Sequence, residues 1–387
     1  MDRSAEPAVA APDALHCLAD VERAAASVLP ADVWDFVAGG SGSETTLDAN
    51  RTALDRLFLV PRVLRDVSAC STRSTLLGRP VSLPVATAPV AYQRLVHPDG
   101  EWATARAAAA AGVPFIASTL SSVPIERIAE AGGAVWFQLY WLRETAAALN
   151  LVRRAEDAGC EAIVLTVDVP WMGRRLRDVR NGFALPAHVQ AANIATSTTA
   201  HEQRQDVSAV AAHTRQEFSA ALTWSSVAEL RRHTRLPVVL KGLLAPEDAL
   251  RAVEFGVDAI VVSNHGGRQL DGAVASVDAL ADVVEAVRGS CEVLLDSGIR
   301  SGTDVLRALA LGASGVLVGR PIVWGLAAGG EAGAARVLDL LAAELRDVMG
   351  LAGCENVAAT SRLRTVRDRG SAGAGPFAGG VRAAAGV

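Results

Sequence analysis

The residues best suited to chemistry cluster in the stretch Ser263-Asn264-His265-Gly266-Gly267-Arg268-Gln269-Leu270-Asp271. A histidine that precedes two glycines at the end of an apolar run has little packing around its ring. Such an imidazole can titrate near neutral pH, as a general base must. Arg268, three residues further on, can offer a fork of hydrogen-bond donors to a carboxylate. The stretch therefore predicts a base and an anion-binding group at one site.

Two glycine-rich turns nearer the C-terminus indicate a phosphate site. Asp296-Ser297-Gly298-Ile299-Arg300-Ser301-Gly302 precedes a stretch of helical period, and Gly319-Arg320-Pro321 follows an apolar run. Backbone N–H groups and arginines bind dianions at such turns, and the loops after strands seven and eight of a barrel are the usual phosphate site. The pairing of the two turns predicts a phosphorylated cofactor.

The cationic residues are almost all arginine. Of the 37 lysines and arginines, only Lys241 is a lysine. The excess of Arg and Ala is typical of a GC-rich coding bias, and drift alone would explain it. Drift should also have removed the last lysine, unless a compact ammonium does something at position 241 that a guanidinium cannot.

Short apolar runs that alternate with Ala-rich stretches predict the elements that position these groups. The runs are continuous rather than alternating, which is typical of strands buried on both faces of a parallel sheet. Eight β-then-α units in about 240 residues favour a (β/α)8 TIM barrel, with a doubly wound sheet as the alternative. The predicted strands span residues 84–88, 113–118, 134–139, 162–168, 237–241, 259–263, 292–296 and 315–319.

Polar or small residues gather where six of these strands should end, which is the active face of a barrel. Any one of them could instead cap a strand or form a turn, but six such ends together favour an active site. The residues are Ser118, Gln138, Tyr140, Thr166, Asp168, Lys241, Ser263, His265 and Asp296.

The chain is expected to comprise an N-terminal helical cap (1–75), the barrel (76–365) and a low-complexity tail (366–387). The connection 177–223, after the fourth strand, is polar and too long for an ordinary loop, so we expect a mobile cover over the active face. The turn Gly39-Gly40-Ser41-Gly42 resembles a phosphate loop. A helix rather than a strand precedes it, which indicates the end of that helix.

Several classes of protein are excluded by composition. A net charge of -5 argues against sequence-blind binding to nucleic acid. No apolar run reaches ~18 residues, so we expect no membrane span, and the N-terminus lacks the apolar core of a signal peptide. Five scattered cysteines with no CxxC spacing predict reduced thiols in the cytoplasm, without a disulfide framework or a metal site.

Together these segments resemble the FMN-dependent α-hydroxy-acid oxidase and dehydrogenase family, which includes glycolate oxidase, lactate oxidase and mandelate dehydrogenase. The resemblance runs from about Leu29 to Arg362 and includes HPDGE (97–101), LTVD (165–168) and SNHGGRQLD (263–271). Within the family, WDFVAGGSG (34–42), APVAYQRL (88–95) and FQLYWLR (137–143) are most similar to actinobacterial 4-hydroxymandelate oxidases. The resemblance implies FMN as cofactor, a homotetramer and, for that branch, antibiotic biosynthesis.

The resemblance also implies roles for the candidate catalytic residues. His265 would be the base that initiates oxidation at the α-carbon, and Asp168 would stabilise the imidazolium. Arg175 and Arg268 would bind the substrate carboxylate, and Tyr140 would form a hydrogen bond with the α-oxygen.

The cofactor residues follow from the same resemblance. Lys241 would lie beside flavin N1 and the C2 carbonyl, where a positive charge stabilises the reduced flavin. Further contacts to the isoalloxazine, ribityl and phosphate parts would come from Pro89, Val90, Ala91, Ser118, Gln138, Thr166, Ser263, Asp296, Gly298, Arg300, Gly319 and Arg320.

Two departures from the glycolate oxidases bear on the substrate. Val37 stands where those enzymes have a carboxylate-binding tyrosine, and Leu120 stands where they have a tryptophan; a smaller change is Ser297, where the usual residue is glycine. Burying an aryl ring in the enlarged apolar pocket would contribute roughly 1.5–3 kcal/mol. We therefore expect an aryl (S)-2-hydroxy acid, (S)-4-hydroxymandelate or mandelate, to be oxidised to the 2-keto acid.

The electron acceptor is the remaining choice. Membrane mandelate dehydrogenases carry an apolar anchor in the loop after strand four, whereas residues 188–216 are polar here. Oxygen is therefore the expected acceptor, with hydrogen peroxide as product. A quinone-linked or other acceptor-linked mandelate or lactate dehydrogenase, decarboxylation in the site as in lactate monooxygenase, and an FMN-barrel isomerase are the alternatives.

Overall fold

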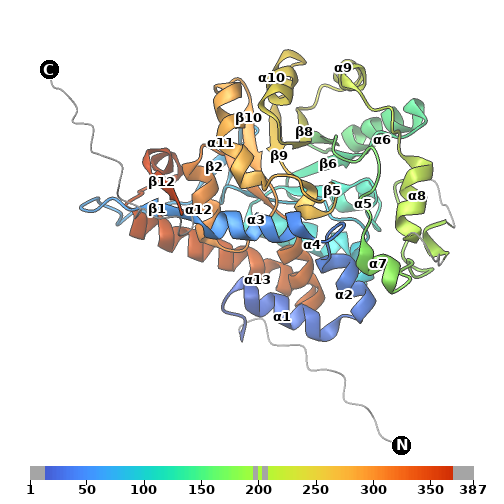
Figure 1. Cartoon of the computed structure of the whole chain (residues 1–387), viewed down its shortest axis with the longest axis horizontal. Helices are drawn as coiled ribbons and strands as arrows, with labels where there is room; N and C mark the ends of the chain where they lie inside the picture. The colour runs from blue at the N-terminus through green and yellow to red at the C-terminus, as the bar shows by residue number, and fades with distance from the viewer. Residues whose placement is uncertain (1–13, 195–198, 203–207, 369–387) are drawn as a thin grey trace, which may run out of the picture.

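A closed barrel of eight parallel strands forms the centre of the computed structural model, which describes residues 14–194, 199–202 and 208–368 (Figure 1). Neighbouring strands follow one another in chain order, and the last strand pairs with the first, Val316 lying opposite Val85. The strands are β4 (Val85–Thr87), β5 (Phe115–Ser118), β6 (Val135–Leu139), β7 (Ala162–Thr166), β8 (Val238–Leu243), β9 (Ala259–Val262), β10 (Glu292–Leu295) and β11 (Gly315–Val318). The predicted (β/α)8 barrel is confirmed, and the doubly wound alternative is wrong.

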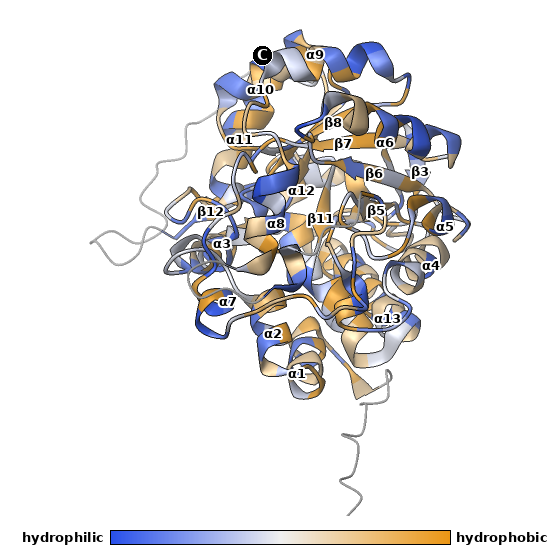
Figure 2. Cartoon of the chain, turned by 90° about the vertical axis from the view of Figure 1, so that its right-hand side faces the viewer, coloured by the Kyte–Doolittle hydropathy of each residue, from blue (hydrophilic) through white to orange (hydrophobic). Residues whose placement is uncertain are grey.

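The continuous apolar runs are explained by burial on both sides of each strand. Along β5, for example, Ile116 points into the barrel interior, while Phe115 packs in the layer between strands and helices. Figure 2 shows hydrophobic residues concentrated in the barrel strands, with hydrophilic residues on the outward sides of the surrounding helices. Such two-sided burial leaves no polar face, so the strands lack the alternation of a half-exposed sheet.

Helices surround the barrel and connect consecutive strands, which places the carboxyl ends of all eight strands on one face. They are α4 (Glu101–Ala111), α5 (Ile125–Ala129), α6 (Thr145–Asp157), α9 (Trp224–His233), α10 (Pro246–Glu254), α11 (Ser276–Val287), α12 (Gly302–Ala310) and α13 (Arg320–Ala352). The last helix is interrupted at Gly329 and Gly330, where the backbone leaves helical geometry. None of the helices among the residues described is long and apolar enough to cross a membrane.

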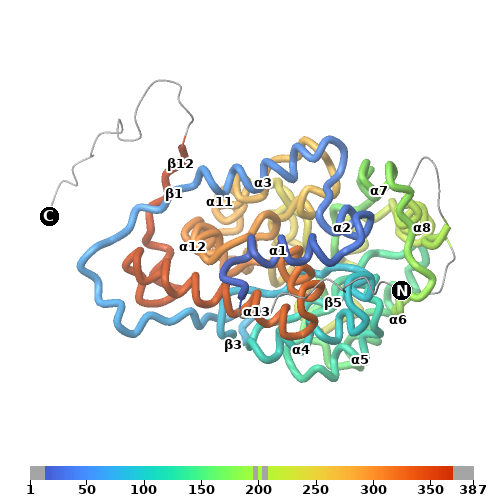
Figure 3. Tube along the Cα trace, turned by 90° about the horizontal axis from the view of Figure 1, so that it is seen from below, coloured from blue at the N-terminus to red at the C-terminus, as the bar shows by residue number. Residues whose placement is uncertain are grey.

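Three helices precede the barrel: α1 (Leu18–Val28), α2 (Ala31–Ala38) and α3 (Thr45–Asp55). Figure 3 shows α1 and α2 lying across α13, and α1 packs directly against it. Helix α2 ends at Ala38, as the interpretation of Gly39-Gly40-Ser41-Gly42 as a helix end requires. Helix α3 was not predicted, and its first turn is capped from far along the chain by Asp271, which accepts hydrogen bonds from Ser43 N and Thr46 N.

Two short antiparallel pairs lie outside the barrel. Strand β1 (Leu57–Val60) pairs with β12 (Arg364–Arg367), and β2 (Ser74–Leu76) pairs with β3 (Arg79–Val81). Figures 1 and 3 place the β1–β12 pair at the opposite end of the molecule from α7 (Leu176–Arg180) and α8 (Ala209–Glu217). The predicted tail (366–387) begins within β12, whose Val366 and Arg367 pair with Phe58 and Leu57, and its residues from 369 onward lie outside the described part.

The connection after β7 is partly helical. It contains α7, the 3-10 turn η3 (Thr199–His201) and α8. Val210, Thr214 and Phe218 of its second half line the pocket described below. The prediction that this connection covers the active face agrees with that position, and its mobility stays a prediction. Residues 195–198 and 203–207 within it lie outside the described part.

Candidate active site

His265 lies in a turn that follows β9 and has unusual backbone geometry. His265 (φ 60°), Gly266 (φ 65°) and Gly267 (φ 74°) are consecutive left-handed residues. A Cβ atom on Gly266 would lie 2.7 Å from Arg320 Nη1, and one on Gly267 would lie 2.6 Å from the backbone of Leu47 in α3. The two glycines are therefore required both by the turn and by the close approach of its neighbours.

Asp168, from the end of β7, holds the imidazole of His265. His265 Nδ1 lies 3.0 Å from Asp168 Oδ1, so the ring presents Nε2 for chemistry. Burial lowers the pKa of His265 below its ordinary value, although the neighbouring Asp168 carboxylate acts in the opposite direction. The imidazole is therefore neutral at neutral pH, as a base must be. Asp168 Oδ2 is buried and has no hydrogen-bond partner among the residues described.

Two buried arginines face this pair. Arg175 is 9% exposed, and its Nε finds no acceptor within the described part of the chain. Arg268 donates to Gly39 O (2.6 Å), and both guanidinium groups lie 5.5 Å from the ring of Phe36. Burial lowers the pKa of each arginine, most strongly that of Arg268, which also has the like charges of Arg175 and Arg320 nearby. An anion bound between the two guanidinium groups would relieve this repulsion.

Tyr140 completes this group. Its ring stacks on Phe218 at a centroid distance of 4.3 Å, which brings the connection after β7 against the site. Burial raises the pKa of the Tyr140 phenol, so the hydroxyl stays protonated and can donate a hydrogen bond.

Lys241, on β8, is the centre of a second group at the neighbouring strand ends. It is 3% exposed, and its Nζ lies 2.8 Å from Asp296 Oδ2 and donates to Ser263 Oγ (3.1 Å). Burial disfavours the ammonium, but the carboxylates of Asp296 and Asp168 outweigh burial and raise the pKa of Lys241. The lone lysine is thus a fixed positive charge among groups from β8, β9 and β10.

Two further arginines, Arg300 and Arg320, follow β10 and β11. The Arg320 side chain donates to three carbonyl groups, of Val37, Gly39 and Gly266, and that of Arg300 donates to Ile299 O and lies over Trp324. In the part of the chain that the structure describes, neither guanidinium pairs directly with a carboxylate. Burial lowers the pKa of Arg300 to about 10 and that of Arg320 to about 9.

This pair of arginines fits a phosphate dianion. Two buried cations without a direct counter-charge would be stabilised by a doubly charged ligand. The turn that brings Arg300 there is shaped by Ser297 (φ 84°) and Gly298 (φ 95°), where left-handed geometry keeps the backbone close to the site. The two glycine-rich turns therefore carry hydrogen-bond donors suited to the phosphate of the predicted cofactor.

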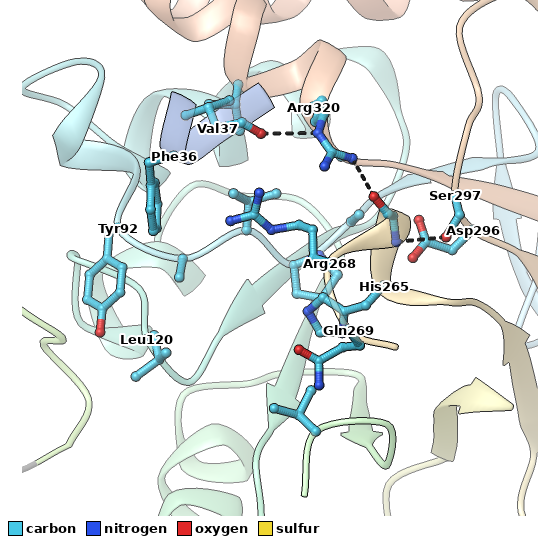
Figure 4. Close-up of a pocket in the computed structure, with 18 of the residues that line it drawn as sticks. Phe36, Val37, Tyr92, Leu120, His265, Arg268, Gln269, Asp296, Ser297 and Arg320 are labelled. Atoms are coloured by element: carbon cyan, nitrogen blue, oxygen red, sulfur yellow. Dashed lines mark hydrogen bonds between the residues drawn. The ribbon is translucent and has the colours of Figure 1, made fainter. Parts of the chain in front are cut away.

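Most of the predicted site residues line one pocket, part of which is drawn in Figure 4. The pocket-lining residues are Val37, Pro89, Val90, Ala91, Leu120, Tyr140, Arg175, Lys241, His265, Arg268, Asp296, Gly298, Arg300, Gly319 and Arg320. Two predicted residues outside this lining contact residues that belong to it: Asp168 contacts His265, and Ser263 contacts Lys241. The others outside it are Ser118, Gln138 and Thr166.

Ser118, Gln138 and Thr166 form a buried row that does not belong to the pocket lining. Ser118 Oγ donates to Gln138 Oε1 (3.1 Å), and Gln138 Nε2 donates to Thr166 Oγ1 (2.9 Å). The row crosses the ends of β5, β6 and β7, and Thr166 is paired in register with Lys241. Their contact with a cofactor stays a prediction.

Other pocket residues were not predicted: Phe36 and Tyr92 lie in segments quoted only for the resemblance, WDFVAGGSG (34–42) and APVAYQRL (88–95), and Phe218 lies in no quoted motif. Phe36 lies on α2 and stacks on Phe183, Tyr92 follows Ala91, and Phe218 follows α8. Gln269 was quoted only as part of a motif, yet its Nε2 donates to Asp168 O and Trp171 O, and its Oε1 accepts from Gly173 N. The resemblance of WDFVAGGSG pointed to the segment that contains Phe36, but it gave this side chain no role.

This fold is a (β/α)8 barrel, and its pocket brings together a histidine held by a carboxylate, two buried arginines beside it, and two more buried arginines suited to a phosphate. Residues 25–367 match the family model described as FMN-dependent dehydrogenase, and the chain belongs to that family. FMN is therefore its cofactor, and it oxidises 2-hydroxy acids.

Individual relatives agree with this assignment. The chain is 64% identical to 4-hydroxymandelate oxidase of Amycolatopsis orientalis, over 90% of this chain and 97% of the relative. It is 46% identical to L-lactate oxidase of Nostoc sp., over 88% of this chain and 95% of the relative. A crystal structure of mandelate oxidase with (S)-4-hydroxymandelic acid superposes with a TM-score of 0.90 at 63% identity, covering 91% of this chain and 99% of that one.

Proposed function

We propose that this enzyme oxidises an aryl (S)-2-hydroxy acid, (S)-4-hydroxymandelate or mandelate, to the 2-keto acid and passes the electrons to oxygen, which yields hydrogen peroxide. The observation that carries the substrate assignment is the apolar wall formed by Phe36, Val37 and Leu120 in the pocket that also contains His265 and the two arginines. The similarity to 4-hydroxymandelate oxidase and mandelate oxidase supports it.

The residues divide the work on the substrate by their chemistry. Arg175 and Arg268 bind the carboxylate, because their buried guanidinium groups lie near one another without direct carboxylate partners among the described residues. The Tyr140 hydroxyl donates to the α-oxygen and fixes the orientation of the α-carbon. His265 Nε2 takes up the proton that the substrate loses when oxidation begins, since Nδ1 is held by Asp168. The Asp168 carboxylate then stabilises the imidazolium that forms.

FMN supplies the two-electron acceptor when it is bound. Arg300 and Arg320, with the Gly298 and Gly319 turns, would hold its phosphate, and the ammonium of Lys241 would favour the negative charge of the reduced cofactor. The hydrogen-bonded row of Ser118, Gln138 and Thr166 holds the ends of β5, β6 and β7 in fixed positions relative to one another.

The substrate assignment predicts the effect of narrowing the apolar wall. Leu120 is 4% exposed, so Leu120→Trp should occupy the space that the aryl ring needs. We expect kcat/KM for mandelate to fall by about 10-fold or more relative to glycolate, because overpacking a filled pocket costs about 1–3 kcal/mol. The rate of anaerobic flavin reduction is measured with mandelate and with glycolate. Comparable rates with glycolate and mandelate in the unaltered enzyme would contradict the assignment.

The acceptor assignment predicts that aerobic turnover yields one hydrogen peroxide per 2-keto acid. The polar sequence of residues 188–216 supports it, because the membrane mandelate dehydrogenases carry an apolar anchor in this connection. A peroxidase-coupled assay beside a keto-acid assay gives the ratio. Turnover only after a quinone is added would instead assign a dehydrogenase, and loss of peroxide with release of the decarboxylated acid would assign a monooxygenase.

The family resemblance supports the assembly and the pathway, and the scattered cysteines support the compartment. We propose a homotetramer in the cytoplasm that serves antibiotic biosynthesis. Exposed apolar side chains near the pocket, Trp171 at 69% and Leu270 at 73%, are available for burial between copies. Light scattering after size-exclusion chromatography measures the number of chains.

A further inference from the structure

Tyr92 carries a buried hydroxyl group that the described part of the protein does not satisfy. The residue is 1% exposed, and its phenol oxygen has no hydrogen-bond partner among the described residues. It is one of only two tyrosines in the chain, the other being Tyr140. A buried hydroxyl without a partner destabilises a fold, and phenylalanine would fill the same space without that cost.

The backbone of Tyr92 is also unfavourable for its residue type. Its φ is 56°, a left-handed conformation that bulky side chains adopt rarely. The conformation is imposed by hydrogen bonds on both sides: Tyr92 N donates to Leu120 O (3.1 Å), and Gln93 N donates to the buried carboxylate of Glu101 (2.9 Å). Glycine would suit the turn and phenylalanine would suit the burial, so folding alone does not explain a tyrosine. Such strain points to a role in binding.

The position of Tyr92 relates it to the substrate. Tyr92 lines the same pocket as His265, and after burial the groups that most affect its pKa are Tyr140 and Arg175, two proposed substrate contacts. In Figure 4, Tyr92 and Leu120 lie on the opposite side of Arg268 from His265 and Asp296. The Tyr92 hydroxyl therefore belongs to the part of the pocket away from the base, beside the apolar wall of Phe36 and Leu120.

We propose that Tyr92 is a specificity-determining residue whose phenol exchanges a hydrogen bond with a hydroxyl at the para position of the substrate ring. This inference rests on the proposed function, and of its two substrates it favours the 4-hydroxyaryl acid. With its carboxylate on the arginines and its α-carbon at His265, an aryl acid directs its para position away from the base. A phenol both donates and accepts, so two hydroxyl groups can pair in that apolar surrounding.

The test compares (S)-4-hydroxymandelate with (S)-mandelate in Tyr92→Phe, by anaerobic flavin reduction of the FMN-loaded enzyme. The ratio of their kcat/KM values should fall by about 5- to 10-fold, the value of one hydrogen bond between neutral groups. Ser121→Ala is the matched control: it removes another buried hydroxyl without a described partner, next to Leu120 but outside the pocket lining. The ratio should stay unchanged in that variant.

A second measurement uses the unaltered enzyme, so that poor folding of a variant cannot obscure the result. (S)-4-Methylmandelate fills the same space as 4-hydroxymandelate but has no hydroxyl group on its ring. Its kcat/KM should be lower than that of 4-hydroxymandelate by the same factor. An unchanged ratio in Tyr92→Phe overturns the proposal, and if FMN dissociation changes in that variant at the same time, Tyr92 contacts the cofactor instead. If glycolate reduces FMN in the unaltered enzyme but (S)-mandelate and (S)-4-hydroxymandelate do not, the proposed function itself is wrong.

Discussion

Replacement of His265 by asparagine is expected to lower the rate of flavin reduction by substrate about 10²- to 10⁴-fold while FMN remains bound. The asparagine amide can still donate to Asp168 in place of Nδ1, but nothing at the position of Nε2 can accept a proton. Stopped-flow bleaching of the flavin under anaerobic conditions measures this step alone, and the visible spectrum before mixing reports FMN content. Unimpaired reduction in this variant would refute the assignment of His265 as the base.

The same assignment fixes the sign of the pH dependence. Because burial lowers the pKa of His265, the neutral imidazole persists below pH 6.5 and is lost only as the pH falls through that lowered pKa. The kcat/KM for the substrate should therefore decline on the acid side of an ordinary histidine titration. Asp168→Asn removes a carboxylate that raises the pKa, so it should move this decline to still lower pH and slow reduction at every pH. His233→Asn, at an exposed histidine outside the pocket, should leave the profile unaltered.

Replacement of Lys241 by arginine is expected to weaken FMN binding or slow its reduction by about 10- to 100-fold. The ammonium lies in full burial between Asp296 and Ser263, and a planar guanidinium needs more room and offers its donors in a different geometry. Overpacking of this kind costs about 1–3 kcal/mol. Equilibrium dialysis of FMN and anaerobic reduction give the two quantities, and an arginine variant with native values of both would show that the lone lysine is a product of drift.

A double substitution separates the stabilising charge of Lys241 from its proposed role toward FMN. Lys241→Met leaves the buried Asp296 carboxylate unpaired and should lower the free energy of unfolding by about 3–5 kcal/mol. Adding Asp296→Asn removes the unpaired charge, so stability should recover in the double variant while flavin reduction stays slow. Thermal unfolding of the apoprotein measures the first effect and stopped-flow the second.

The sequence alone determined the architecture, because the barrel is encoded locally. Each strand is a continuous apolar run, and each lies between stretches of helical period, so pattern and fold agree. The location of the site follows from the same pattern, since the polar residues at the ends of the apolar runs all lie on the face formed by the carboxyl ends of the strands. For this reason His265, Lys241 and the glycine-rich turns could be placed in a common site before any contact was known.

The tertiary structure decided what surrounds those groups. Helix α3 begins where it does because Asp271, more than 200 residues away, caps it. The turn at Gly39, without chemistry of its own, supplies a carbonyl that holds both Arg268 and Arg320. The sequence shows that Tyr92 is one of two tyrosines, but only the fold leaves its hydroxyl buried without a described partner. Local propensity sets which segments are strands and helices, whereas burial and hydrogen-bond satisfaction depend on residues that only the closed barrel brings together.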